Sequence, residues 1–348
     1  MFKVSVSARK MENLLIPVTV IKGDGVGPSI VESAIQVLDC ANSGLSYEYV
    51  DAGLVALEKT GDLLPQESLD SIERNRVVLK GPLTTPIGEG FSSINVSLRQ
   101  KFQLYANVRP VVSFKGTNAH YDDIDIITVR ENTEGMYSGA GQIVSKDGLI
   151  AEATSIISRK GAERILKYAF DLARNKHRKK VTVVHKANIL KSTSGLFLKV
   201  AREISQLYPD IQSEEMIVDN ACMQLVMYPQ KFDVIVTTNL FGDILSDLCA
   251  GLVGGLGMAP GANIGDDIAI FEAVHGSAPD IAGRNIANPT SIILAACQML
   301  EYLHKPDQAR RIQNALHDVI EKGDRTTPDL GGQSGTSQFT QAILERLT

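Results

Sequence analysis

The sequence predicts an α/β protein, in which a largely parallel sheet is covered by helices. Short apolar runs rich in β-branched residues alternate with amphipathic helical segments along almost the whole chain. One such run, FDVIVTT at residues 232–238, is apolar throughout, as expected of a parallel strand buried on both faces. With 348 residues and 44% hydrophobic content, the chain is long enough for two α/β domains, or for one core interrupted by another.

The elements follow from these periodicities. The expected strands cover residues 17–21, 47–52, 77–80, 104–110, 123–130, 181–185, 214–219, 232–238 and 268–274. The expected helices cover residues 29–42, 66–75, 92–102, 161–173 and 195–208, a segment after Gly242, and residues 289–303, 306–322 and 337–347. The glycine-rich segment 134–148 (EGMYSGAGQIVSKDG) is the least core-like part, and it suits a protruding arm or hairpin.

The bulk composition excludes several classes of partner. A formal net charge of −5 and a pI near 5.8 predict neither nucleic acid nor an anionic membrane as partner. The basic run at residues 174–180 closes a helix, where cations favour the helix dipole, so a solvated helix end is expected there. Four widely spaced cysteines predict buried thiols in a reducing compartment. The expected location is the cytoplasm or, in a eukaryote, the mitochondrial matrix.

Two carboxylates four residues apart give the clearest chemical signal. Asp243 and Asp247 share one face of the helix that follows the strand at 232–238. Ile244, Leu245 and Leu248 predict that this helix is mostly buried, so a cation should lie between the two acids. A divalent metal held by oxygen ligands is the simplest candidate, and a solvated acidic stripe is the alternative.

Three arginines follow or lie near β-rich runs. Arg109 and Arg130 are expected at strand ends and Arg99 on the helix SSINVSLRQKF; together they would suit a small polycarboxylate, because guanidinium groups match carboxylates in bidentate fashion. Singly, each is more often a surface residue. Ser93 and Asn95 open the same helix, and Asn95 precedes Arg99 by one turn. Ser93 equally suits a residue that only satisfies first-turn amides.

Two glycine-rich loops suggest nucleotide binding without proving it. The segment KGDGVGP (22–28) lacks the spacing of the dinucleotide-binding fingerprint, so a plain tight turn is at least as good an interpretation. The loop HGSAPDIAG (275–283) offers His275, backbone donors and Asp280, which suits a ribose hydroxyl. Tyr137 and Lys186 are candidates for proton transfer if burial or nearby cations lower their pKa values.

Taken together, these motifs resemble the metal-dependent β-decarboxylating dehydrogenases, the family of isocitrate, 3-isopropylmalate, homoisocitrate and tartrate dehydrogenases. The segments GDGVGP, GPLTTP, LYANVRP, RENTEG, HKANI, NLFGDILSD, GGLGMAPGANIG and HGSAPDIAG match in order from about Pro17 to the C-terminus. Within the family, FSSINVSLRQ resembles the isocitrate enzymes, in which a Ser-x-Asn pair receives the third carboxylate; isopropylmalate enzymes present apolar side chains there.

The resemblance implies an isopropylmalate dehydrogenase-like fold. A large nucleotide-binding domain would comprise residues 1–104 and 254–348, a small domain 105–137 and 159–253, and a clasp or arm 138–158. Two copies of the chain would share each site in a homodimer that can belong to a higher oligomer.

The resemblance also implies the site residues and their roles. Substrate would be isocitrate, bound by Ser93, Asn95, Arg99, Arg109 and Arg130. Mg²⁺ or Mn²⁺ would be held by Asp243 and Asp247 with Asp219 of a partner chain. Catalysis would use Tyr137 and Asp243 with the partner's Lys186. The cofactor would be met by Thr84, Asn188, His275, Gly276, Ala278, Asp280, Ile281 and Asn288.

The implied reaction is NAD-dependent oxidative decarboxylation of isocitrate to 2-oxoglutarate and CO₂, a step of the tricarboxylic acid cycle. Asp280 followed by Ile281 resembles the NAD-using pattern of the family, whereas NADP-using isocitrate enzymes present Lys and Tyr there. A 3-isopropylmalate or homoisocitrate dehydrogenase is the nearest alternative. From a different class, the chain would be a non-catalytic regulatory subunit that binds citrate or a nucleotide.

Overall fold

The computed structural model describes residues 15–86, 93–117 and 119–348, and its centre is one ten-stranded sheet. The strand order is β2-β1-β3-β12-β11-β4-β5-β10-β8-β9. In chain order the strands of this sheet are β1 (Ile16–Ile21), β2 (Leu45–Val50), β3 (Val77–Lys80), β4 (Ala106–Val112), β5 (Asp125–Glu131), β8 (Lys180–His185), β9 (Gln212–Ile217), β10 (Val234–Thr237), β11 (Pro260–Ile264) and β12 (Ala269–Ala273). The α/β class predicted from the alternating pattern is confirmed.

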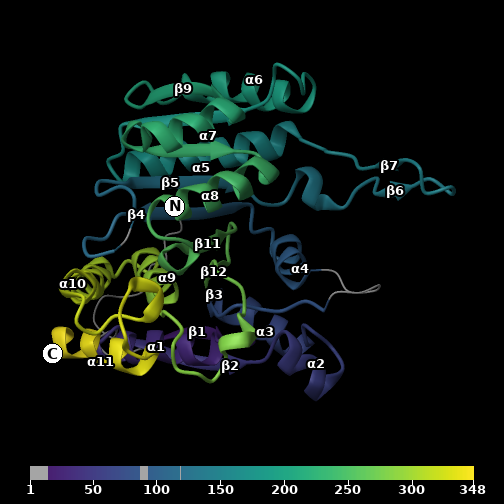
Figure 1. Ribbon diagram of the computed structural model, residues 1–348. Coiled ribbons are helices and arrows are strands. Elements are labelled where there is room, and N and C mark those ends of the chain that lie inside the picture. The colour runs from purple at the N-terminus through teal and green to yellow at the C-terminus, as the bar shows by residue number, and fades with distance from the viewer. Residues whose placement is uncertain (1–14, 87–92, 118) are drawn as a thin grey trace, which may run out of the picture.

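The sheet has two parallel halves joined by antiparallel strands. β2, β1, β3 and β12 are mutually parallel, as are β5, β10, β8 and β9. Between them β11 runs antiparallel to β12 and β4, and β4 antiparallel to β5. The first half is built from the beginning and the end of the chain and the second from its middle (Figure 1), so the middle of the chain is inserted into the first core.

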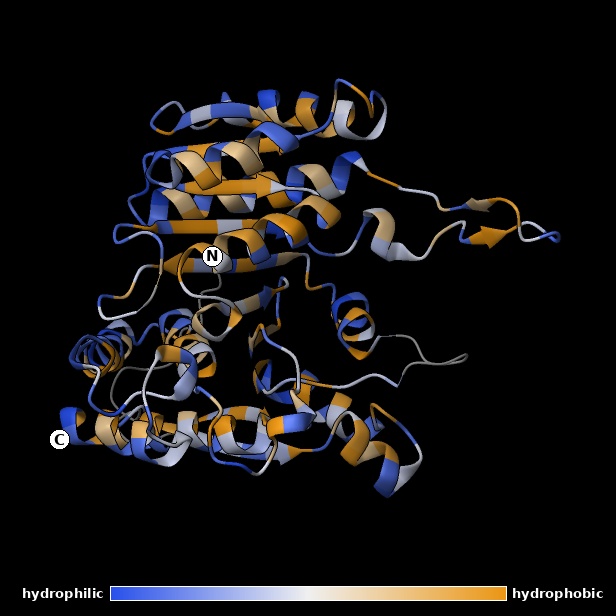
Figure 2. Cartoon of the chain, viewed as in Figure 1, coloured by the Kyte–Doolittle hydropathy of each residue, from blue (hydrophilic) through white to orange (hydrophobic). Residues whose placement is uncertain are grey.

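Helices cover both halves of the sheet, and their apolar faces form the core. They are α1 (Gly27–Cys40), α2 (Leu54–Thr60), α3 (Gln66–Asn75), α4 (Ile94–Lys101), α5 (Arg159–Asn175), α6 (Thr193–Ser205), α7 (Val218–Met227), α8 (Asn239–Leu252), α9 (Thr290–Tyr302), α10 (Pro306–Lys322) and α11 (Thr336–Leu347). Apolar residues concentrate on the strands and the inward helix faces in Figure 2. The start expected for α4, Ser92, lies outside the described residues, as do residues 1–14.

An arm projects from the second half of the molecule (Figure 1), where the glycine-rich segment predicted a protruding hairpin. After the 3₁₀ turn η1 (Gly135–Ser138), β6 (Ile143–Val144) pairs antiparallel with β7 (Ala151–Glu152) in a separate two-stranded sheet. Its apolar side chains are exposed, Val144 by 66% and Leu149 by 81%. These side chains leave an exposed apolar surface on the two-stranded hairpin.

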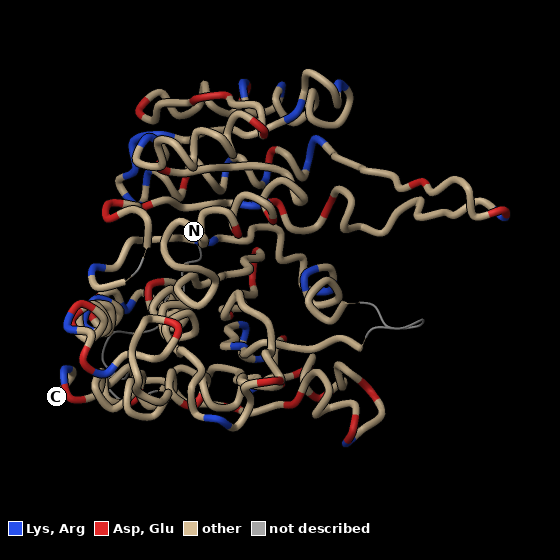
Figure 3. Tube along the Cα trace, viewed as in Figure 1, with Lys and Arg blue, Asp and Glu red and all other residues tan. Residues whose placement is uncertain are grey.

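The remaining bulk predictions concern thiols, charge and membranes. Cys40, Cys222, Cys249 and Cys297 are all free. Acidic and basic positions intermingle over both halves in Figure 3, which agrees with the weak net charge. Among the described residues, every helix is too short or too polar to cross a membrane.

Candidate active site

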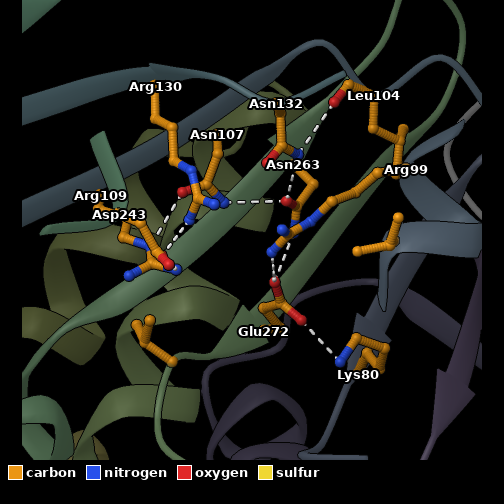
Figure 4. A network of polar contacts seen from close by, with 12 residues as sticks. Lys80, Arg99, Leu104, Asn107, Arg109, Arg130, Asn132, Asp243, Asn263 and Glu272 are labelled. Atoms are coloured by element: carbon orange, nitrogen blue, oxygen red, sulfur yellow. Dashed lines mark hydrogen bonds and ion pairs between the residues drawn. The ribbon is translucent and has the colours of Figure 1, made fainter. Parts of the chain in front are cut away.

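Three arginines meet where the two halves of the sheet join. Arg109 lies in β4, Arg130 in β5 and Arg99 on α4, and Figure 4 shows them converging from these elements. Arg130 is 1% exposed, and burial together with the charge of Arg99 lowers its pKa to about 10. Burial also lowers the pKa of Arg99. Cations crowded into a region of low dielectric favour an anionic ligand with several carboxylates.

The two aspartates of α8 face this cluster, and a cation does lie between them. Nη1 of Arg109 is 2.9 Å from Oδ1 of Asp247, and its Nη2 is 3.8 Å from Oδ1 of Asp243. Arg130 forms a further ion pair with Asp243. Within one chain, therefore, a guanidinium group bridges the two carboxylates that sequence analysis assigned to a metal.

Two details of the sequence prediction were wrong here. Helix α8 is only half-buried: Leu245 is inaccessible, but Ile244 is 51% exposed, because the helix packs one face on the sheet and leaves the other open. Arg109 lies inside β4 rather than at its end. β11 pairs only with Ala106–Val108, so Pro110, which lacks a backbone donor, is tolerated where β4 pairs with β5 alone.

Tyr137 and Asp243 form a hydrogen bond at the mouth of the cluster. The Tyr137 hydroxyl donates to Asp243, and the guanidinium of Arg130 lies 4.9 Å from the centre of the tyrosine ring. Burial and the neighbouring Asp243 raise the pKa of Tyr137, so the condition that its pKa be lowered is not met for this residue. Burial opposes ionisation of Asp243, but Arg130 and Tyr137 outweigh it and lower its pKa. The pair is thus a protonated phenol beside a carboxylate, which suits Tyr137 as a proton donor.

Ser93 and Asn95 stand at the start of α4, on the same helix as Arg99. Ser93 is exposed and is the N-cap residue, accepting a hydrogen bond from Val96 N at 3.5 Å. This is the capping role that sequence analysis left open. Asn95 Oδ1 is buried without a hydrogen-bond partner among the described residues. An unpaired amide oxygen one turn from Arg99 leaves hydrogen-bonding capacity at this end of the site.

Lys186, Asn188 and Asp219 lie elsewhere, in the second half of the sheet. Lys186 follows β8 and forms an ion pair with Asp219 at the start of α7, whose carboxylate is 68% exposed. The lysine lowers the pKa of Asp219. In the parts of the chain that the structure describes, no three His, Cys, Asp or Glu side chains gather closely enough to hold a metal ion. Within one chain, therefore, Lys186 and Asp219 lie apart from the arginine cluster.

The nucleotide candidates gather around the turn after β12. The Thr84 hydroxyl lies 2.6 Å from that of Ser277, and Asn288 donates to Asp329 at 2.9 Å. Burial lowers the pKa of His275, whose Nε2 is buried without a described partner. Gly276, Ala278, Asp280 and Ile281 follow in the same loop, with Asp280 exposed on the turn η4 (Pro279–Ile281). Only Asn188 is distant from this group.

The glycine-rich turn after β1 supports this loop by packing. A Cβ on Gly25, whose φ is +59°, would lie 1.9 Å from the carbonyl oxygen of Ser277. The buried Asp24 accepts hydrogen bonds from the backbone nitrogens of Thr84 and Leu54, which joins three loops. The tight-turn interpretation of KGDGVGP is therefore correct, since glycine is needed for close backbone approach.

A buried polar network that sequence analysis missed lies behind the arginines (Figure 4). Lys80 Nζ is 2.6 Å from Glu272 Oε2, and these side chains are 2% and 8% exposed. Asn107 and Asn263 connect Arg109 to Glu272, and Asn132 donates a further hydrogen bond to Asn263. The available signal was a lysine and a glutamate inside apolar strands, because buried charges require partners.

Comparison with known proteins agrees with this architecture. The family model "Isocitrate/isopropylmalate dehydrogenase" matches residues 17–343. The chain belongs to this family. It is 49% identical to NAD isocitrate dehydrogenase catalytic subunit 5 of Arabidopsis thaliana mitochondria, over 95% of this chain and 88% of that protein. It is also 49% identical to the chloroplastic 3-isopropylmalate dehydrogenase of Solanum tuberosum, over 89% of this chain and 86% of the relative.

A solved structure shows the same fold in this family. The isocitrate dehydrogenase of Methylococcus capsulatus superposes with a TM-score of 0.92 at 56% identity, covering 96% of this chain and 99% of that one. The Arabidopsis isocitrate dehydrogenase subunit and the Solanum isopropylmalate dehydrogenase are both 49% identical to this chain, so identity to these two relatives does not separate the two substrates. The residues that face the substrate must do so.

Proposed function

We propose that this protein is an NAD-dependent isocitrate dehydrogenase that decarboxylates isocitrate to 2-oxoglutarate. The observation that carries the proposal is the buried cluster of Arg99, Arg109 and Arg130, with Ser93 and Asn95 at the start of the helix that carries Arg99. Three fixed guanidinium groups suit a tricarboxylate. The isopropyl group of the rival substrate would meet a hydroxyl, an unpaired amide oxygen and a cation, none of which it can satisfy.

The residues of one chain would divide the work as follows. The arginines hold the substrate carboxylates, and Tyr137, kept protonated by its raised pKa, delivers a proton to the enolate carbon after CO₂ leaves. Asp243, ionised beside Arg130, accepts hydrogen bonds and orients the substrate hydroxyl. Asp280 would hold NAD by accepting hydrogen bonds from its adenosine ribose, and the cofactor would supply the hydride acceptor.

A divalent metal fits the residues present. Asp243 and Asp247 offer two carboxylates on one helix face, exposed by 34% and 55%, and a divalent ion would match their combined charge of −2. Mg²⁺ or Mn²⁺, held by these acids and Asp219 of a second copy, would supply polarisation of the substrate carbonyl.

A second copy of the chain would complete each site. Lys186, which would take the proton from the substrate hydroxyl, and Asp219 form a pair away from the arginines. Around them apolar residues are exposed, including Met223, Met227 and Ile244 by about half. An apolar surface around half of a site suits a homodimer related by a twofold axis. In each copy the large and small domains would meet at residues 104/105 and 253/254, and residues 138–158 would form the arm.

Substrate comparison tests the activity. Purified protein is assayed with isocitrate, 3-isopropylmalate and homoisocitrate, with NAD or NADP and Mg²⁺ or Mn²⁺. We expect kcat/KM for isocitrate to exceed that for 3-isopropylmalate by up to about 10⁴-fold, because the site's polar groups are left unpaired by an apolar analogue. Equal values for the two would remove the isocitrate assignment. Absence of turnover with every substrate would favour the regulatory subunit.

Mixed dimers test the shared site. Lys186→Met and Asp243→Asn proteins should each be inactive, but co-refolded dimers contain one intact site built from both chains. Random assembly should restore about a quarter of the wild-type sites, since half of the dimers are mixed and half of their sites are intact. Continued inactivity of mixed dimers would place each site within one chain.

A further inference from the structure

We propose that Asn107 and Asn263 are positioning residues, which link the substrate arginine Arg109 to the nucleotide side of the site through a polarised chain of amides. The inference rests on the proposed function, because it assigns one end of this chain to isocitrate and the other to NAD. It extends that function by predicting that the two ligands bind interdependently.

The hydrogen bonds form one continuous line through the sheet (Figure 4). Arg109 Nε donates to Asn107 Oδ1 at 2.9 Å, and Asn107 Nδ2 donates to Asn263 Oδ1 at 2.9 Å. Asn263 Nδ2 then donates to Glu272 Oε1 at 2.6 Å. The line therefore crosses three neighbouring strands, from β4 through β11 to β12.

Both ends of the line fix the direction of every bond. A guanidinium group only donates, so Asn107 must present its oxygen to Arg109 and its NH₂ group to Asn263. A carboxylate only accepts, so Asn263 must present its NH₂ group to Glu272. Although burial opposes ionisation, Lys80 and Arg99 lower the pKa of Glu272 to about 2, which keeps it an acceptor. The amide dipoles are thus aligned between a cation and an anion, an arrangement in which each bond strengthens the next.

The line is dry. Asn107 is inaccessible to solvent, Asn263 is 3% exposed and Glu272 6% exposed. The side-chain amides of Asn107 and Asn263 therefore cannot exchange their hydrogen-bond partners for water. If one amide group rotated, its NH₂ group would face another donor. A displacement of the Arg109 side chain would therefore either move Glu272 through the two amide groups or be opposed by the hydrogen bonds that hold Glu272 in place.

The two ends of the line lead to different parts of the proposed site, although Glu272 also lies 3.9 Å from Arg99 on the substrate side. Arg109 contacts Asp247, within the carboxylate and metal side of the site. Glu272 lies one residue before the end of β12, which continues into the loop at 275–283, and its partner Lys80 ends β3, which continues towards Thr84. A ligand that shifts either loop therefore acts on the same hydrogen-bonded line as a substrate held by Arg109.

Asn132 provides a matched control. It donates to Asn263 Oδ1 at 3.0 Å and to the Leu104 carbonyl at 3.0 Å, and it is 4% exposed. Its removal costs buried hydrogen bonds of the same kind, but the line from Arg109 to Glu272 stays intact. Asn107→Ala and Asn263→Ala interrupt that line.

The experiment measures isocitrate binding in the presence of Mg²⁺ by calorimetry, with and without saturating NADH. Isocitrate cannot reduce NADH, so the ternary complex does not turn over. In the wild type and in Asn132→Ala, NADH should change the Kd for isocitrate by about 5-fold or more, within the usual range of coupling between sites. In Asn107→Ala and Asn263→Ala the ratio of the two Kd values should fall to near 1, and the double variant should lose no more.

The outcomes separate the hypotheses. Failure of wild-type protein to bind isocitrate would contradict the proposed function, whereas normal binding with a ratio of 1 would contradict the amide line alone. Equal loss of the ratio in Asn132→Ala would show general damage and also overturn it. Thermal unfolding checks that each variant folds, and Asn107→Ala interrupts the same line if Asn263→Ala does not fold.

Discussion

Two lysine–carboxylate pairs lie near the ends of parallel strands in the two halves of the sheet, and they differ in almost every other respect. Lys80 and Glu272 are 2% and 8% exposed and are enclosed by further hydrogen-bond partners. Lys186 and Asp219 are 25% and 68% exposed, on a surface with exposed apolar neighbours. The first pair is completed within one chain, whereas the second leaves a carboxylate open to a ligand. Burial thus distinguishes an ion pair held inside the protein from one at its surface.

Removal of the metal should have the largest effect of all the changes considered. It concerns the exposed carboxylates, among them Asp219, rather than the buried pair of Lys80 and Glu272. Chelation with EDTA should abolish turnover while the circular dichroism spectrum is retained, because the aspartates remain paired with arginines. Asp247→Asn should lower metal-supported activity greatly, since it removes a ligand charge and keeps the shape. A full rate in EDTA would show that no metal takes part.

Lys186→Met should separate catalysis from stability. We expect kcat to fall by about 10²–10⁴-fold through loss of proton transfer, with an unchanged denaturation midpoint because the pair is exposed. Lys191→Met is the control, since Lys191 is an exposed lysine on the following turn. If the denaturation midpoint fell strongly in Lys186→Met but not in Lys191→Met, the pair of Lys186 and Asp219 would have a structural role, as the pair of Lys80 and Glu272 does.

Glu272→Gln should have the opposite pattern to Lys186→Met, because its main effect should be a lower free energy of unfolding. Neutralising Glu272 leaves the Lys80 ammonium group buried without its counter-ion, for which a loss of about 3–5 kcal/mol is typical. Urea unfolding measures this loss. Lys80→Met combined with Glu272→Gln should recover part of it, because no unpaired charge then remains. A wild-type midpoint for Glu272→Gln would mean that the ion pair contributes nothing.

The same pair predicts a smaller effect of acid. The pKa of Glu272 is about 2 in the folded protein, below the ordinary value of 4.5. The ionised pair therefore contributes fully above about pH 4.5, and this stability is lost as the pH falls towards 2. Wild-type unfolding free energy should decline more steeply across this window than that of Glu272→Gln. If the unfolding free energies of the two proteins change with pH in parallel, the neighbours of Glu272 do not lower its pKa.

Cofactor choice should show the smallest effect, because the charge on which it depends, that of Asp280, is exposed to solvent. NAD should be preferred over NADP, since a 2′-phosphate would meet the charge of Asp280 on its exposed turn. Asp280→Lys with Ile281→Tyr should shift the ratio of the two kcat/KM values towards NADP without producing a fully NADP-specific enzyme. Unmutated protein that uses both cofactors equally would show that Asp280 does not face the ribose.

The sequence determined most of the local structure. The helices expected at 66–75 and 306–322 end at those residues in α3 and α10, because helical periodicity and their flanking residues are read within a few turns. Strand 77–80 is likewise exact. The Asp243 and Asp247 spacing also placed both acids on one helix face without knowledge of any other segment.

Only the tertiary structure decided which groups meet. Arg109, 134 or more residues before the acids of α8 in the chain, is the cation between them, and β11 was not expected as a strand at all. Lys80 finds Glu272 because β3 and β12 are neighbours, while Asp219 remains apart from Asp243. Periodicity reports how a segment buries its own surface, whereas these pairings depend on strand order and on contacts between segments distant in sequence.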